Sequence, residues 1–352
     1  MGAGRVANRQ PVCLAEGENC AFADAAESGA GTTPATRDES AKEVAESFKI
    51  GRRRGGRVAR MSDLLTSANA FIVREARLLE RRLHATLFEG APAAGVVHAL
   101  RGYQNDDGGF GHALEPDKRC PASQPLDVQI ALETLCAAGT TDVSMLQRAC
   151  DYLARVGPDG GVPPVLPSIA AYPRAAHWGD GNFPPGVNPT AALAGLLHAL
   201  GVEHPWLGAA DEFCWRELER ELPHDAHALA VTLVFLEHVP DRERAEALAG
   251  PVAAQLPDAE WYLADADAEG YGLTPLAFAP TPDSRWRSLF DDGQIAAHLD
   301  RLERDQQPDG GWPVTWDPPS DASRLEWRGI VALGALRTLR AYGRLPESAR
   351  RR

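Results

Sequence analysis

The sequence predicts an all-α protein, an (α/α) toroid or barrel of about five to six helical hairpins. Apolar residues recur at helical spacing along most of the chain, and no segment has a convincing strand pattern. A short turn motif recurs between the helical segments, which indicates stacked units that cannot bury their apolar faces alone. The four copies of the motif are Gln104–Phe110, Gly157–Val162, Ala268–Gly272 and Gln306–Trp312.

The best copy of the turn runs from Gln306 to Trp312 and contains Asp-Gly-Gly. Glycine tolerates the positive φ that such a reversal needs, and aspartate can bond to its own backbone in the turn. The amide of Gln306 can bridge the end of one helix to the start of the next. We therefore expect Gln306, Gly310, Gly311 and Trp312 to be structural, with the Trp312 ring packed on the apolar layer.

Residues 1–60 differ from the rest of the chain. They are rich in Gly, Ala, Ser and charged residues and lack apolar periodicity, which is typical of disorder. Met61 is followed by Ser62 and Asp63, a good helix N-cap. We therefore expect translation to begin naturally at Met61, with a functional arm as the alternative, and the leader to be dispensable for stability. A single domain is expected over 61–345, with a disordered tail over 346–352.

The first half of the domain is predicted as helices on both sides of the first turn. Apolar residues at helical spacing mark the segments Phe71 to Leu83, Val96 to Tyr103, Val128 to Leu135 and Val143 to Val156. Gly139 is a typical stop signal after the third of these segments.

In the second half, the Asn188-Pro189 pair is a standard start signal for a helix of small residues, Ala191 to Leu200. Small residues suit close packing on the inner ring of a barrel. The remaining helices are predicted over Trp206 to Leu222, Asp225 to His238, Arg242 to Leu256, Ser284 to Gln306 and Ser323 to Tyr342.

Composition narrows the class of partner. The 352 residues carry a formal net charge of −13, which argues against nucleic acid or an anionic membrane as the main partner. No apolar run is long enough to span a bilayer. The cysteines lack CxxC spacing, which is typical of a reduced, cytoplasmic protein. They are Cys13, Cys20, Cys120, Cys136, Cys150 and Cys214.

The repeated turn resembles the QW repeat of the squalene-hopene cyclase and protein prenyltransferase superfamily. Gln306 to Trp312 matches that pattern well, and Gln104 to Phe110 matches it with Phe for Trp. The similarity covers roughly residues 90–345 and extends to small bacterial prenyltransferase-like proteins. The resemblance implies a toroid that binds an isoprenoid in a central apolar cavity.

The sequence departs from the known catalytic motifs of that superfamily. The Asp-x-Asp-Asp motif of the acid-initiated cyclases is missing, and the nearest string is Asp265-Ala-Asp267. The aspartate-rich magnesium motif is missing too. A zinc site made from His112, Asp117, Cys120 and His177 would lack any supporting local spacing. We therefore predict no cofactor, since Mg or Zn would have to bind without a recognisable motif.

The candidate site follows the first turn, where His112, Glu115 and Asp117 replace the proline and apolar residues that follow the other copies. The repeat does not need these groups, although capping or turn roles would also explain the carboxylates. Asp117 is our first choice for a general acid, because burial beside an apolar cavity favours its neutral form. His112 could orient it.

Asp292 is a further catalytic candidate, although Asp291 and Asp292 also suit the first turn of a helix. Several mainly aromatic residues complete the expected site as substrate contacts. They are Phe110, Tyr172, His177, Trp178, Tyr271, Trp312, Trp316 and Glu326.

The leading hypothesis is a terpenoid cyclase-like or prenyltransferase-like enzyme with a non-standard acid, since aromatic rings can stabilise a cation. A glycan-processing (α/α)-barrel enzyme is one alternative, and it would need paired carboxylates among Glu115, Asp117 and Asp292. A non-catalytic toroid that binds an isoprenoid or a protein is the other.

Overall fold

The computed structural model describes residues 60–346, so the expectations for the leader and for the tail from residue 347 lie outside it. This part of the chain contains twelve α-helices and no named strand, which confirms the all-α prediction. None of these helices has the length and apolarity needed to cross a membrane.

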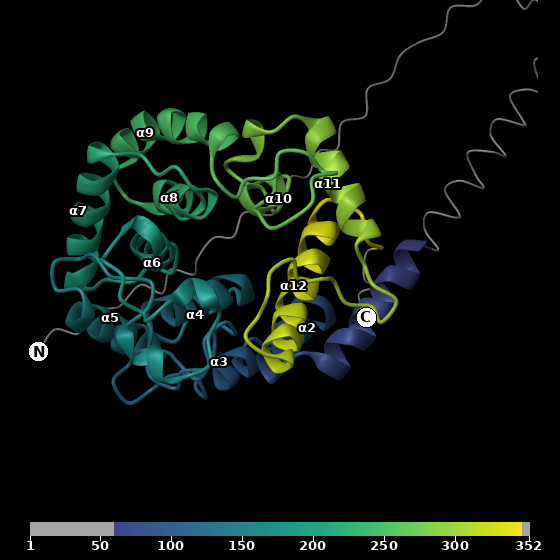
Figure 1. The fold of residues 1–352 in the computed structure, drawn as a ribbon, viewed down its shortest axis with the longest axis horizontal. Coiled ribbons are helices and arrows are strands. Elements are labelled where there is room, and N and C mark those ends of the chain that lie inside the picture. Colours follow the sequence, from purple (N-terminus) through teal and green to yellow (C-terminus); the bar gives the residue numbers. More distant parts are fainter. Residues whose placement is uncertain (1–59, 347–352) are drawn as a thin grey trace, which may run out of the picture. The chain divides into compact units, whose positions relative to one another are not determined.

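The helices follow one another through loops and short 3-10 turns (Figure 1). The first covers residues 60–75. The others are α2 (Leu78–Glu89), α3 (Ala94–Leu100), α4 (Pro125–Ala138), α5 (Val143–Val156), α6 (Val187–Ala199), α7 (Pro205–Arg220), α8 (Ala226–His238), α9 (Arg242–Gln255), α10 (Pro275–Phe278), α11 (Asp292–Arg304) and α12 (Asp321–Ala341).

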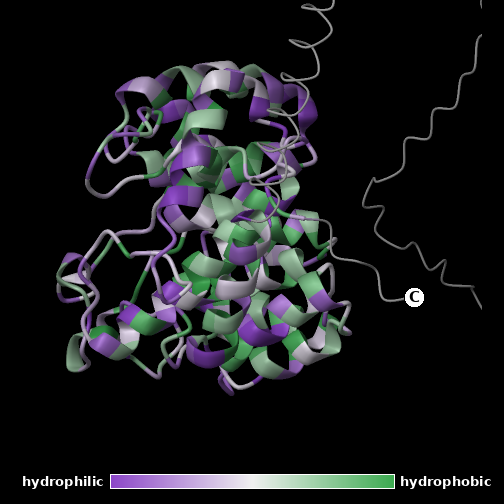
Figure 2. Cartoon of the chain, turned by 90° about the vertical axis from the view of Figure 1, so that its right-hand side faces the viewer, coloured by the Kyte–Doolittle hydropathy of each residue, from purple (hydrophilic) through white to green (hydrophobic). Residues whose placement is uncertain are grey.

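Inner and outer helices alternate along the chain. In Figure 1, α4, α6, α8, α10 and α12 lie toward the middle of the body, and α5, α7, α9 and α11 lie around them. Contacts join α2 to α4, α4 to α6, α6 to α8 and α8 to α10, while α12 contacts α2. In the side view of Figure 2, long loops project from one side of the helical body.

Three copies of the repeated turn use one packing arrangement. The first glycine of each has positive φ, at 90° in Gly108, 93° in Gly160 and 94° in Gly310. A Cβ on any of them would lie 2.1 to 2.2 Å from a backbone oxygen of the next outer helix. Only glycine permits that approach. The outer helices are α5, α7 and, for the last turn, the helix of residues 60–75, so the last repeat packs on the first helix.

The glutamines bridge helices as predicted. The Gln104 amide donates to Gly108 O (2.9 Å) and to Met145 O at the start of α5 (3.0 Å). Gln306 repeats this arrangement on Gly310 O (3.0 Å) and on Leu64 O of the first helix (2.9 Å). In the Ala268–Gly272 copy, Gly270 also has positive φ, but a Cβ there would meet nothing within 4 Å, so this glycine does not approach a helix backbone as the other three do.

Three helix predictions need correction. Residue 60 is already helical, so Ser62 and Asp63 lie inside the first helix and do not cap it. The segment predicted as helical from Phe71 to Leu83 is interrupted at residues 76–77, which separate two helices. The segment predicted from Ser284 becomes helical only at Asp292, where Asp291 caps α11 by accepting from Gln294 N (2.7 Å). The prediction from Ser284 relied on apolar spacing, which does not take account of Asp291, a residue type strongly favoured at helix N-caps.

The small residues of α6 pack closely, as predicted. A Cβ on Gly195 would lie 2.6 Å from Val234 O of α8, so the backbones of the two helices come into direct contact at this glycine. The helix is buried along most of its length.

Candidate functional site

The loop that follows the first turn has an unusual backbone. His112 and Ala113 have φ values of 58° and 60°, a left-handed conformation that non-glycine residues rarely adopt. Arg77, just before α2, holds this stretch by donating from Nη1 to Ala113 O (3.0 Å) and Leu114 O (2.9 Å). Backbone strain that the surroundings stabilise in this way concentrates at functional sites.

A buried lysine anchors the next part of the loop. Lys118 Nζ lies 3.0 Å from Glu115 Oε2 and 3.1 Å from Asp127 Oδ1 in the first turn of α4. Asp127 Oδ1 also accepts from Glu115 N at 2.6 Å. Burial raises the pKa of Asp127 to about 6, although the Lys118 charge opposes this. Glu115 is therefore part of an internal ion cluster that fixes the loop to α4.

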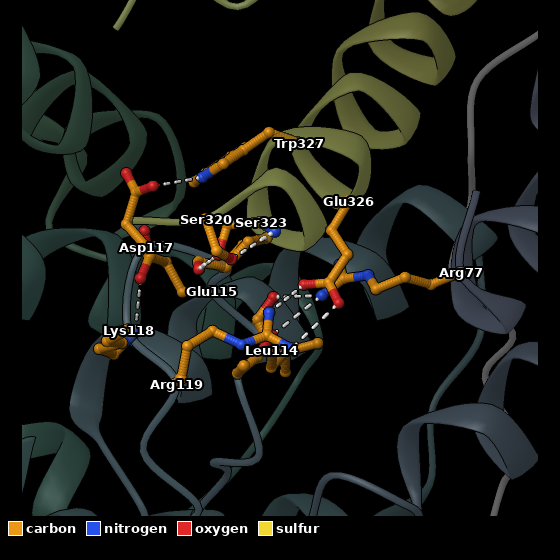
Figure 3. A network of polar contacts seen from close by, with 12 residues as sticks. Arg77, Leu114, Glu115, Asp117, Lys118, Arg119, Ser320, Ser323, Glu326 and Trp327 are labelled. Carbon is orange, nitrogen blue, oxygen red and sulfur yellow. Dashed lines mark hydrogen bonds and ion pairs between the residues drawn. The ribbon is translucent and has the colours of Figure 1, made fainter. Parts of the chain in front are cut away.

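Asp117 lies between the Lys118 ion cluster and α12. Its side chain is 4% exposed, and Oδ1 accepts a hydrogen bond from Trp327 Nε1 at 2.8 Å (Figure 3). No described cationic side chain lies within ion-pair distance of this carboxyl. Burial, and then the Glu115 charge, raise the pKa of Asp117 to about 6, while the Trp327 hydrogen bond acts in the opposite direction.

Hydrogen bonds fix the backbone at Asp117 and at the preceding residue, Pro116. Ala175 N donates to Asp117 O (2.7 Å), and Ser323 Oγ of α12 donates to Pro116 O (2.7 Å). The carboxyl therefore has a fixed position relative to the start of α12 and to the long loop before α6.

An aromatic row leads away from Asp117. We use this name for Trp327, Trp316, Tyr271 and His227. The centroids of successive rings lie 5.0, 5.6 and 5.6 Å apart, with the first two contacts edge-on and the third stacked. Burial lowers the pKa of His227 and raises that of Tyr271, so a neutral hydroxyl faces a neutral imidazole at 2.7 Å. Tyr271 is 42% exposed, which makes this end of the row accessible.

A half-exposed ion pair forms the other side of the site. Arg119 contacts both carboxylate oxygens of Glu326, with Nη1 to Oε2 at 2.5 Å and Nη2 to Oε1 at 3.2 Å (Figure 3). Glu326 was predicted as a substrate contact, and its neighbour Trp327 provides the hydrogen bond to Asp117.

Two predicted catalytic residues lie away from Asp117. His112 is exposed, and its Nε2 pairs with Asn105 Oδ1 at 2.9 Å, so the imidazole makes no hydrogen bond to Asp117. Asp292 is in the first turn of α11, where its fully exposed carboxylate pairs with Arg287. This arrangement matches the helix-dipole interpretation of Asp292.

The predicted substrate contacts divide into four groups. Phe110 and Trp312 are core residues with 1% exposure, and Trp312 Nε1 donates to Leu302 O (2.8 Å). Tyr172 and His177 are exposed on the loop before α6. Trp178 packs under that loop in a small apolar cluster with Phe183, Cys120, Val165 and Ile169. Tyr271, Trp316 and Glu326 form the fourth group, which lies around Asp117.

Five members of the site were not predicted from the sequence: Lys118, Arg119, Asp127, Trp327 and His227. Features of the sequence could have identified two of them, Lys118 and Trp327. Lys118 is one of only three lysines in the chain and follows Asp117 directly. Trp327 follows Glu326, and both lie near the start of the last helix.

Among the described residues, no group of three or more His, Cys, Asp and Glu side chains could hold a metal ion. The Cys120 thiol, a member of the hypothetical zinc set, donates to Ser168 O at 3.6 Å. The sequence matches no protein-family model and no curated protein.

Proposed function

We propose that this chain is an enzyme of the (α/α)-toroid type in which Asp117 is a general acid for an isoprenoid substrate. The observation that carries this proposal is a buried carboxyl that has no ion-pair partner in the described part of the chain, accepts a hydrogen bond from an indole N–H and lies beside a row of aromatic rings.

Two features support the toroid. Contacts run from α2 through α4, α6 and α8 to α10, continue through α11 to α12, and return from α12 to α2, which is the order expected of a ring. The last repeated turn also packs on the first helix as the first turn packs on α5.

The environment of Asp117 suits proton donation. With a pKa of about 6, about a tenth of the Asp117 carboxyl is protonated at pH 7, and a general acid works best with a pKa near the operating pH. After the proton leaves, the Trp327 N–H stabilises the carboxylate. Cationic character that develops on the substrate would be stabilised by the electron-rich faces of neighbouring rings.

The glycan-processing alternative has less support because it needs a second available carboxylate. Glu115 and Asp127 are tied to Lys118, Glu326 is tied to Arg119, and Asp292 is paired with Arg287. Each of these carboxylates already has a cationic partner, whereas no side chain within residues 60–346 forms an ion pair with Asp117.

A substrate screen tests the proposal. The protein is incubated with prenyl diphosphates, prenyl alcohols and their epoxides, and products are identified by mass spectrometry. Asp117→Asn should retain the fold and lose at least about a hundredfold in turnover, while Asp292→Asn should match the wild type. Equal turnover in wild type and Asp117→Asn, or binding with no conversion of any substrate, would reject the assignment in favour of another acid or a binding protein.

A further inference from the structure

A partly enclosed cavity of about 100 Å³ lies where the first helix and α2 meet the end of α12. In Figure 1, α2 and α12 lie beside each other, and contacts join them. An apolar cavity of about 150 Å³ can hold benzene, so this one has room for a molecule of roughly four to five non-hydrogen atoms. The cavity is separate from the candidate site, because Trp327 and Arg340 are thirteen residues apart on α12, a rise of about 20 Å.

An arginine provides the positive charge of this cavity. Arg340 Nη1 donates to Leu87 O at 2.5 Å, and its Cζ lies 4.1 Å from the centroid of the Phe88 ring. Within residues 60–346, no carboxylate lies within ion-pair distance of Arg340. Burial lowers the pKa of this guanidinium, which shows that its charge is poorly compensated. Since a guanidinium has several further N–H donors, Arg340 can still bind an anion.

A buried histidine lines the same cavity. His84 is 2% exposed, and its Nε2 lies 2.8 Å from Asn69 Oδ1. An amide oxygen only accepts, so Nε2 carries a hydrogen and Nδ1 is the nitrogen that can gain a proton. Nδ1 lies 3.5 Å from Oε1 of Glu89, a largely exposed side chain. Burial lowers the pKa of His84, the Glu89 charge opposes this, and the Arg340 charge adds to it. An added anion would therefore favour protonation of this ring.

The rest of the lining is mainly apolar. Leu65 comes from the first helix, Phe88 from α2, and the buried Leu345 from the segment that follows α12. The His84 and Phe88 rings are stacked, with their centroids 5.0 Å apart. The cavity therefore combines hydrocarbon surface with a cation and a protonatable ring.

We propose that this cavity binds a short-chain monocarboxylate such as propionate, with the carboxylate against Arg340 and His84 and the hydrocarbon part against Phe88. This site goes beyond the proposed function. A carboxylate matches the planar N–H groups of a guanidinium, and hydrogen bonds between such charged groups are stronger than those between neutral ones. Propionate also has the size that the volume admits. Inorganic phosphate would leave the apolar lining without a contact, and an organic cation would be repelled by Arg340.

Binding at this site should depend on pH. The bound carboxylate stabilises protonated His84 and so raises the pKa of the imidazole, and by linkage propionate binds more tightly as pH falls through that titration. The charged groups that influence the ring are Glu89 on its own helix and Arg340 on α12, while the first helix presents the neutral amide of Asn69. Glu89 would compete with the ligand for Nδ1, whereas Arg340 attracts the ligand in both protonation states of the ring.

An NMR titration of the imidazole signals tests the inference, with His84→Gln to assign the His84 signal. The probes are sodium propionate, neutral propionamide and sodium phosphate at constant ionic strength. Propionate should shift the His84 signal saturably, with a dissociation constant in the millimolar range or below, and should bind more tightly at about pH 6 than at about pH 8. Propionamide should bind at least about tenfold more weakly, because it lacks the charge, and phosphate should also bind more weakly than propionate.

Variants of two arginines locate the site. Arg340→Gln should weaken propionate binding at least about tenfold, while Arg340→Lys keeps a cation and should retain more of the affinity. Arg82→Gln removes an exposed arginine on α2 outside the cavity and should change nothing. Thermal unfolding checks the fold of each variant. If Arg340→Gln does not fold, the comparison of propionate with propionamide in the wild type decides the question.

Four results overturn the inference. They are the absence of a saturable His84 shift with propionate, equal binding of propionate and propionamide, tighter binding of phosphate than of propionate, and equal propionate binding in folded Arg340→Gln and Arg82→Gln.

Discussion

Asp117 should destabilise the folded protein at neutral pH, so Asp117→Asn should stabilise it. The carboxyl has an ordinary pKa of 3.8 and a folded-state pKa of about 6. In the folded state it therefore holds its proton over a pH range in which the unfolded chain has lost it. The contribution of this group to stability falls as pH rises from 3.8 to about 6 and is constant above that range.

The magnitude follows from the difference of about two pKa units. Each unit corresponds to about 1.4 kcal/mol, which gives a loss of roughly 2 to 3 kcal/mol between pH 4 and pH 7. Asparagine keeps the shape and the oxygen that accepts from Trp327 Nε1, but it does not ionise. The variant should therefore gain up to about that amount at pH 7 and gain little at pH 4.

Denaturant unfolding at a series of pH values from 4 to 7.5 measures the effect. Asp292→Asn is the control, because that carboxylate is exposed and should change stability by no more than a few tenths of a kcal/mol to about 1 kcal/mol. A loss of stability in Asp117→Asn at pH 7, or a difference from the wild type that does not vary with pH, would refute the reasoning about burial.

Three other predictions concern the framework of the site. Trp312→Ala should cost about 3 to 5 kcal/mol in denaturant unfolding because the ring is fully buried, and unchanged stability would contradict that role. Lys118→Met should also cost about 3 to 5 kcal/mol, because Glu115 and Asp127 would remain buried without a cation. A loss of less than about 1 kcal/mol in the free energy of unfolding would contradict a charged interaction of Lys118 with Glu115 and Asp127. Trp327→Phe keeps a ring but removes the indole N–H, so the pKa of Asp117 should rise by one to two units in a carboxyl NMR titration, the scale of a hydrogen bond to a charged group. A fall in that pKa would contradict the geometry.

The repeated turn was the most informative part of the sequence. Its glycines and glutamines have local chemical requirements, and the structure meets them at Gly108, Gly310, Gln104 and Gln306. Apolar spacing located the helices but not their first residues, as at Asp292, because periodicity continues through the loop residues that precede a helix.

The candidate site was only partly predictable. Asp117 was recognisable because the other repeats lack a carboxylate there. Its donor Trp327 and the ion pair of Arg119 with Glu326 join segments about 200 residues apart, with sequence separations of 210 and 207. No local pattern encodes such contacts. His112 was assigned to the site because it precedes Asp117 closely, but the left-handed backbone at His112 and Ala113 turns the imidazole toward Asn105.

The most direct test of the central claim is the titration of the Asp117 carboxyl itself, followed by carbon NMR with Asp117→Asn to assign the signal. The midpoint should lie near pH 6, so that the carboxyl holds a proton in part of the population at neutral pH. A midpoint at or below the ordinary value of 3.8 would mean an ionised hydrogen-bond acceptor, and Asp117 would then not be the general acid.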